Sequence, residues 1–150
     1  MAESVFAKIV AGSIPCHRLY EDEHVLAFLD VGPIARGHCL LIPKVGYVEL
    51  DEMPPKVGAA LGRVMPQLCA AVKSATGCDG VNVLQNNGSA AGQAVMHVHF
   101  HFIPRYTSLQ DGKNSGSGGG NGLHFEWRPG PLGDDDAARL QDAIMASLAK

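Results

Sequence analysis

Hydrophobic and polar positions along the chain follow two different periods, which separate helices from strands. Spacings of three and four after Asp51 predict one long amphipathic helix with an apolar face of Val57, Leu61, Val64, Leu68, Val72 and Ala75. Pro66 lies in the middle of this segment, so we expect either a kink there or a helix that begins later. Ser4 is a suitable N-cap for a short helix over residues 5–11, which Gly12 would close.

Short apolar runs bounded by glycine, proline and acidic turns predict strands between these helices. The runs are residues 24–30, 39–42, 81–86 and 97–104, with an extended segment at 16–20. Three consecutive aspartates open a C-terminal helix that we place at residues 133–150. Together these elements indicate an α+β fold with an antiparallel sheet of about five strands, one main helix and a short N-terminal helix.

Residues 106–126 contain a stretch rich in glycine, serine and asparagine, DGKNSGSGGGNG at 111–122. We interpret it as a flexible surface insertion, because such a composition cannot build a packed core. Too few residues follow it for a second core, so we expect a single domain over residues 1–150.

Composition and charge exclude several classes of protein. The chain carries 12 Lys+Arg against 15 Asp+Glu, a formal net charge of −3, which argues against a nucleic-acid partner. No apolar run reaches the roughly 18 residues of a membrane span, and the first residues lack the pattern of a secretory signal. The four cysteines form no C-x-x-C motif and indicate reduced thiols, although a disulfide between some pair stays open. We therefore expect a cytoplasmic protein with neither a nucleic-acid nor a membrane partner.

Three of the chain's 7 histidines alternate strictly with apolar residues in the segment HVHFHFI at 97–103. On a strand, His97, His99 and His101 would share one face at spacings of roughly 6.5–7 Å, so one bound group could meet more than one imidazole. Such a face can bind a metal or supply a neutral imidazole as a nucleophile. The preceding loop at 86–93 offers amides, a hydroxyl and glycine backbone for phosphate oxygens, but no carboxylate or thiol as a further metal ligand. This favours nucleophilic chemistry at phosphorus, with metal binding as the alternative.

The segment HVHFHFI resembles the signature of the histidine triad (HIT) superfamily, in which three histidines alternate with apolar residues. The resemblance extends in the expected order over residues 5–105 and is greatest to the branch of the histidine triad nucleotide-binding proteins. It implies a homodimer that pairs the sheets of two subunits. It also implies hydrolysis of purine nucleoside, typically adenosine, 5′-monophosphoramidates to the nucleoside monophosphate and an amine, without a cofactor.

The same resemblance implies roles for individual residues. His99 would attack the α-phosphorus and form a nucleotidyl-histidine that water hydrolyses. His101 would contact the phosphate and the leaving group, and His97 would hold the local geometry by hydrogen bonding. Asp30 would bind the ribose hydroxyls. The remaining contacts would come from an apolar slot for the base and from the phosphate-side loop: Phe6, Ile9, Phe28 and Val31, then Asn86, Gly92 and Gln93.

Several positions depart from the family pattern. Some relatives bind structural zinc through a C-x-x-C pair and a histidine, where this chain has Ser4, Ala7 and Gly46, so we expect no metal. Ala94 stands where relatives often have a hydroxyl that donates a proton to the departing amine. We expect slower turnover or a more acidic leaving group as the consequence.

Other interpretations of these residues and of the function remain. Asp30 is equally well explained as a cap of the turn that follows it, and Asn86 as the start of an Asx turn. The remaining histidines belong to no cluster and are expected at the surface or in packing: His17, His24, His38 and His124. Trp127 is a candidate to extend into the site of the second subunit. Alternative functions are a dinucleoside polyphosphate hydrolase or nucleotidyl transferase of the same superfamily, and a catalytically weak nucleotide-binding regulator.

Overall fold

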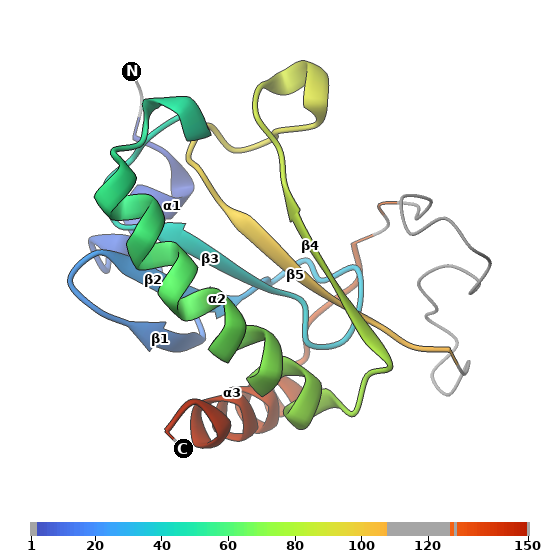
Figure 1. Ribbon diagram of the computed structural model, residues 1–150. Coiled ribbons are helices and arrows are strands. Elements are labelled where there is room, and N and C mark those ends of the chain that lie inside the picture. The colour runs from blue at the N-terminus through green and yellow to red at the C-terminus, as the bar shows by residue number, and fades with distance from the viewer. Residues whose placement is uncertain (1–2, 108–126, 128, 150) are drawn as a thin grey trace.

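A computed structural model describes residues 3–107, 127 and 129–149 and contains a five-stranded antiparallel sheet (Figure 1). The strands lie in the order β1-β2-β3-β5-β4. Their bounds are β1 (Arg18–Glu21), β2 (Val25–Leu29), β3 (Cys39–Pro43), β4 (Gly80–Gln85) and β5 (Phe100–Arg105). The predicted α+β class and antiparallel sheet are confirmed.

Three α-helices and two 3-10 turns accompany the sheet in the described part of the chain. They are α1 (Val5–Val10), α2 (Pro55–Thr76), α3 (Asp134–Leu148), η1 (Leu50–Glu52) and η2 (Ser89–Ala91). No helix among the described residues has the length and apolarity needed to cross a membrane. Of the predicted insertion at 106–126, only residues 106 and 107 lie within the described part of the chain.

The main helix α2 begins at Pro55, so of the two alternatives expected from Pro66, a kink or a later start, the later start is wrong. Proline is well suited to the first turn of a helix, because the N–H that it lacks would have no partner there. Pro66 lies inside the helix, and α2 continues past it to Thr76. Gly77 ends α2 in the left-handed region at φ 66°, where glycine is favoured, and its N–H donates to Lys73 O.

One face of the sheet is covered by α2 and α3, which pack against each other (Figure 1). Val64, Leu68 and Val72 of α2 join Leu140 and Ile144 of α3 in the larger hydrophobic cluster. The sheet contributes the side chains that alternate toward these helices: Val25, Ala27, Leu29, Cys39, Leu41 and Phe102. This face forms the larger hydrophobic core.

The opposite face carries a smaller cluster beneath α1. Phe6 and Ile9 of α1 pack there against alternate residues of the two central strands, namely Leu26, Phe28, Leu40 and Ile42. Because β2 and β3 are buried on both faces, their sequences are continuous apolar runs rather than alternating ones. The short α1 leaves part of this face to polar side chains.

The histidine segment enters the sheet later than its alternation predicts. The predicted strand at 97–104 is observed only as β5, from Phe100 onward. The N–H of Val98 donates to Tyr47 O at 2.7 Å, so this part of the segment bonds to the loop after β3 instead of to a neighbouring strand. His97 and His99 therefore lie just before β5, at the end of the sheet where the loop from β4 arrives (Figure 1).

Candidate active site

His99 has its ring orientation set by the main chain beside it. Its Nδ1 lies 2.7 Å from the carbonyl oxygen of His97. A carbonyl only accepts, so Nδ1 carries the proton and the lone pair of His99 is on Nε2. His99 is 5 % exposed. The geometry thus presents a neutral imidazole with one nucleophilic nitrogen.

His97 is fully buried and makes a hydrogen bond with each ring nitrogen. Its Nε2 donates to Pro43 O at 2.8 Å, so Nδ1 is the acceptor. The hydroxyl of Ser4 lies 3.0 Å from Nδ1 and donates to it. His97 therefore holds the histidine segment against both the end of β3 and the start of α1.

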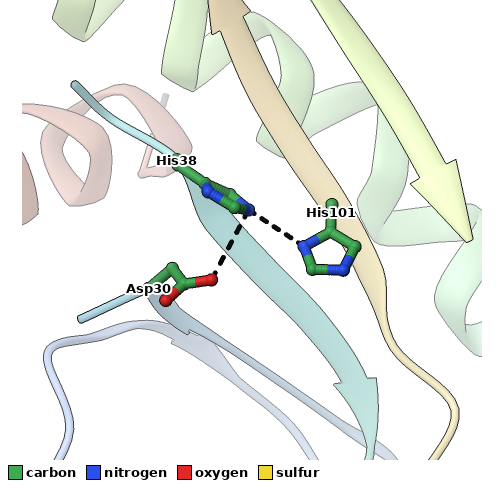
Figure 2. A group of neighbouring side chains, drawn as sticks. All are labelled: Asp30, His38 and His101. Atoms are coloured by element: carbon green, nitrogen blue, oxygen red, sulfur yellow. Dashed lines mark hydrogen bonds and ion pairs between the residues drawn. The ribbon is translucent and has the colours of Figure 1, made fainter. Parts of the chain in front are cut away.

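His38 belongs to the same cluster, which the sequence analysis missed. The N–H of Ile34 donates to His38 Nδ1 at 3.2 Å, which places the His38 proton on Nε2. That nitrogen lies 2.9 Å from His101 Nδ1, so His38 donates to His101 (Figure 2). His101 consequently carries its own proton on Nε2. The expectation that His38 would be a surface or packing residue outside any cluster is wrong.

A signal for His38 is present in the sequence. His38 precedes Leu40 and Ile42 by two and four positions, and side chains at alternate positions of a strand share a face. The pairing of Leu29 with Cys39 also places Asp30 opposite His38, and the N–H of Asp30 donates to His38 O at 3.0 Å. If the predicted strand at 39–42 is extended back by one residue, the same alternation places His38 on the face of Leu40 and Ile42.

Asp30 makes two kinds of contact. Its Oδ1 accepts from the N–H of Gly32 at 2.8 Å, as the turn-cap interpretation predicts. Its Oδ2 lies 3.6 Å from His38 Nε2 (Figure 2). The cap therefore uses one carboxylate oxygen, and the other faces the histidine cluster.

Asp30, His38 and His101 have ligand atoms within 4.8 Å of one another, which is close enough to consider a metal ion. A metal-bound histidine normally donates its second ring N–H to an acceptor. His38 Nδ1 instead faces a donor, the N–H of Ile34. Binding a metal at His38 Nε2 would set two N–H groups against each other. The cluster is arranged as a hydrogen-bond chain, and it does not fit a metal.

Burial lowers the pKa of all four imidazoles. Desolvation first, and neighbouring imidazoles second, lower the pKa of His38 to about 4 and that of His101 to about 3. Desolvation also lowers the pKa of His97 and of His99. Near neutral pH the cluster is uncharged, which is the form in which an imidazole can attack phosphorus.

Aromatic rings frame the cluster on two sides. The ring of Phe6 on α1 lies edge-on to His99, with centroids 5.1 Å apart, and to Phe28 at 5.7 Å. Trp127 lies 4.9 Å from His101 and 5.8 Å from His38. The structure thus places Trp127 against the histidines of its own chain.

Of the four residues expected to form the base slot, Phe6, Ile9 and Phe28 share one buried cluster. Val31 follows the end of β2 and is 70 % exposed. The structure therefore brings three of these side chains together, and the fourth lies at the surface.

The loop between β4 and β5 is held by the side chain of Gln93. Its Nε2 donates to Val48 O at 2.7 Å and to Val95 O at 3.1 Å, and its Oε1 accepts from the N–H of Gly88 at 2.7 Å. The Asn86 side chain reaches Gly92 O at 3.5 Å. Gln93 is 3 % exposed, so its amide shapes the loop from within.

Comparisons with known proteins agree with this fold. The HIT domain family model matches residues 11–108. Adenylylsulfatase HINT3 of Arabidopsis thaliana is 48% identical over 69% of this chain, and the match spans 52% of that protein, about half its length. Adenosine 5′-monophosphoramidase hnt1 of Schizosaccharomyces pombe is 37% identical over 96% of this chain and 97% of that protein. A crystal structure of a Hit-like protein from Bartonella henselae covers 97% of this chain and 96% of its own, with a TM-score of 0.78 and 31% identity.

Proposed function

Since this chain belongs to the HIT family, we propose that it hydrolyses adenosine or other purine nucleoside 5′-monophosphoramidates through a nucleotidyl-His99 intermediate. The observation that carries the proposal is the 2.7 Å contact from His99 Nδ1 to the carbonyl oxygen of His97. This contact leaves the lone pair of a neutral imidazole on Nε2. In the positively charged intermediate, the Nδ1–H still has a carbonyl oxygen to which it donates. The S. pombe relative, which matches nearly the whole chain, carries the name of this activity.

The reaction would run in two displacements. In the first, His99 Nε2 forms a bond to the α-phosphorus and the P–N bond breaks, and the amine leaves with a proton that solvent supplies by way of His101 Nε2 and that the attacking water returns in the second displacement. His101 suits this role because His38 occupies its Nδ1, so that Nε2 is the nitrogen available for proton transfer. In the second, water attacks phosphorus, the bond to His99 breaks, and the nucleoside monophosphate is released.

The nucleotide would lie along the face that carries α1. We place the base against Phe6, Ile9, Phe28 and Val31 and the ribose hydroxyls on the Asp30 oxygen that does not cap the turn. The phosphate would lie at the loop of Asn86 and Gly92. Gln93 would serve by holding that loop, because its amide already bonds Gly88, Val48 and Val95.

We also propose that the chain works as a homodimer in the cytoplasm. β4 is an edge strand, and Val83 on it is 49 % exposed. An exposed apolar edge strand is a template for pairing with a second copy. The four cysteines are free, which suits a reducing compartment. Small nucleotides would be its substrates, bound without a cofactor.

A second substrate class, adenosine 5′-phosphosulfate, is favoured by the leaving-group side of the site. Ala94 supplies no hydroxyl there, and burial keeps the pKa of His101 low, so a neutral imidazole is a weak source of the proton that an amine needs. Sulfate leaves as a stable anion and needs no proton. The Arabidopsis relative is named as an adenylylsulfatase.

Rapid-quench mass spectrometry tests the mechanism and the substrate class together. Wild type and His99→Gln are mixed with an adenosine phosphoramidate, adenosine 5′-phosphosulfate or a diadenosine polyphosphate, and intact mass and released AMP are measured. We expect a nucleotidyl adduct on wild type only, and AMP release at least about 10³-fold slower in the variant. His24→Gln is the matched control, since His24 lies outside the cluster.

The outcome separates the candidate functions. Equal AMP release by wild type and His99→Gln would rule out the mechanism. Faster release from the phosphosulfate than from the phosphoramidate would assign the acidic leaving group. Nucleotide binding without an adduct or release from any of the three substrates would leave a regulatory binding protein.

A further inference from the structure

Ser4 contacts the histidine cluster from far away in the sequence. Its hydroxyl oxygen is the N-cap of α1, where it accepts from the N–H of Ala7 at 3.0 Å. The same oxygen lies 3.0 Å from His97 Nδ1. One side chain thus joins the beginning of the chain to the segment that carries the nucleophile.

We propose that Ser4 is a positioning residue for His99, because its hydroxyl proton holds the ring of His97, whose carbonyl orients the nucleophile. The proposal rests on the proposed function for its kinetic consequence. Its structural part, the hydrogen bond from Ser4 to His97, stands independently of any substrate.

The direction of each hydrogen bond follows from the partners. The N–H of Ala7 can only donate, so it uses a lone pair of Ser4 Oγ and leaves the hydroxyl proton for another acceptor. His97 Nε2 donates to Pro43 O, so Nδ1 is that acceptor. His97 is 0 % exposed, and a buried nitrogen that loses its donor pays a desolvation penalty.

Gly46 and Phe6 are neighbours of the His97 ring. A Cβ added to Gly46 would lie 3.7 Å from Nδ1 and 3.8 Å from Cε1 of His97, so the chain at Gly46 packs directly beside the ring. The ring of Phe6 lies edge-on at 5.9 Å between centroids. Among these neighbours Ser4 is the hydrogen-bond donor to Nδ1; Ser4 caps α1, and Phe6 lies on it.

Three substitutions separate the positioning role from helix capping. Ser4→Thr keeps the cap and the hydroxyl proton. Ser4→Gly stays close to the wild-type cap in stability but has no side chain to contact His97. Ser4→Ala loses both the cap and the contact. We expect kcat for the preferred adenosine substrate to match wild type in Ser4→Thr and to fall about tenfold in both Ser4→Gly and Ser4→Ala, with KM changed less. Only Ser4→Ala should lower the melting temperature through loss of the cap.

Nitrogen NMR of the ligand-free protein supplies a readout that a capping role would not move. In wild type and Ser4→Thr the His97 Nδ1 resonance should be that of an unprotonated nitrogen accepting a hydrogen bond. In Ser4→Ala it should move to the position of an unbonded nitrogen. Ser4→Gly should show the same shifted resonance as Ser4→Ala.

Two results would overturn the proposal. One is a kcat for Ser4→Gly equal to that of wild type, which would reduce Ser4 to a helix cap. The other is a His97 Nδ1 resonance that is the same in wild type and Ser4→Ala. If wild type turns over none of the three substrates, the proposed function fails, and the NMR comparison still decides whether Ser4 holds His97.

Discussion

The two faces of the sheet share the strands β2 and β3 but differ in what covers them. On one face α2 and α3 close over apolar side chains such as Leu68, Phe102 and Leu140, each no more than 1 % exposed. On the other, a helix of 6 residues covers Phe28 and leaves the adjoining area to four buried imidazoles. Alternate residues of the same strands serve these two environments.

The difference shows how stability and chemistry are kept apart in a small domain. Apolar burial behind α2 and α3 gives the favourable free energy of folding. Burying imidazoles opposes folding unless each nitrogen finds a partner, and on the α1 face the partners are Pro43, Ser4, Ile34 and the histidines themselves. Substitutions on the two faces should therefore change different measured quantities.

The largest effect on stability is expected on the face covered by α2 and α3. Leu68→Ala removes a fully buried side chain, so the free energy of unfolding should fall by about 2–5 kcal/mol. The kcat of the folded fraction should stay near that of wild type. Urea unfolding followed by circular dichroism measures the free energy of unfolding. AMP release under folding conditions measures kcat. Met145→Ala on the exposed side of α3 is the control, with little change in either. A large loss of kcat in folded Leu68→Ala would break the separation of the two faces.

The histidine face should make stability depend on pH. Burial lowers the pKa of His38 to about 4, so between pH 6.5 and 4 the unfolded chain binds more protons than the folded protein. The contribution of a neutral buried His38 is complete above pH 6.5 and is lost as the pH falls toward 4. We expect this loss to be about 1–3 kcal/mol. Denaturant unfolding at a series of pH values should show a shallower pH dependence in His38→Gln than in wild type. Identical slopes would contradict the neutral, buried state of His38.

The smallest expected effect is a gain on the exposed side of α2. Gly62 lies inside this helix, and a Cβ added there meets nothing within 4 Å. Gly62→Ala should raise the free energy of unfolding by about 0.5–1 kcal/mol, because alanine loses less backbone entropy in a helix. Gly77→Ala is the contrasting variant, since φ is 66° there and the same change should destabilise. Thermal melts should show a higher melting temperature for Gly62→Ala and a lower one for Gly77→Ala. A loss of stability in Gly62→Ala would show that α2 does not tolerate the added methyl group.

The sequence predicts most of the fold because local patterns decide it. The spacing along α2 and the apolar runs of β2 and β3 locate these elements to within a few residues. The start of β5 is missed because the bond from Val98 to Tyr47 depends on the loop after β3, which no local alternation reveals. The later start considered for α2 is wrong for a similar reason, since packing of α2 against α3 outweighs the local helix-breaking preference of Pro66.

The candidate site is predicted less completely, since its contacts join distant residues. The triad alternation identifies His97, His99 and His101 directly. His38 is missed because the apolar run of β3 begins at Cys39, although the alternation of side chains along β3 continues back to His38. The contact of Ser4 with His97 spans 93 positions and depends on how α1 docks, which spacing alone cannot reveal.

The hydrogen bonds through His38 all run in one direction, from the N–H of Ile34 to His38 and from His38 to His101. The series begins at the amide of Ile34, and a peptide N–H does not release its proton at ordinary pH. Protons therefore cannot enter or leave the His38–His101 pair through that end. Proton transfer is confined to Nε2 of His101 and to the side of His38 that faces Asp30. The pair therefore cannot relay a proton from Ile34 to His101, and it exchanges protons only at the end away from Ile34.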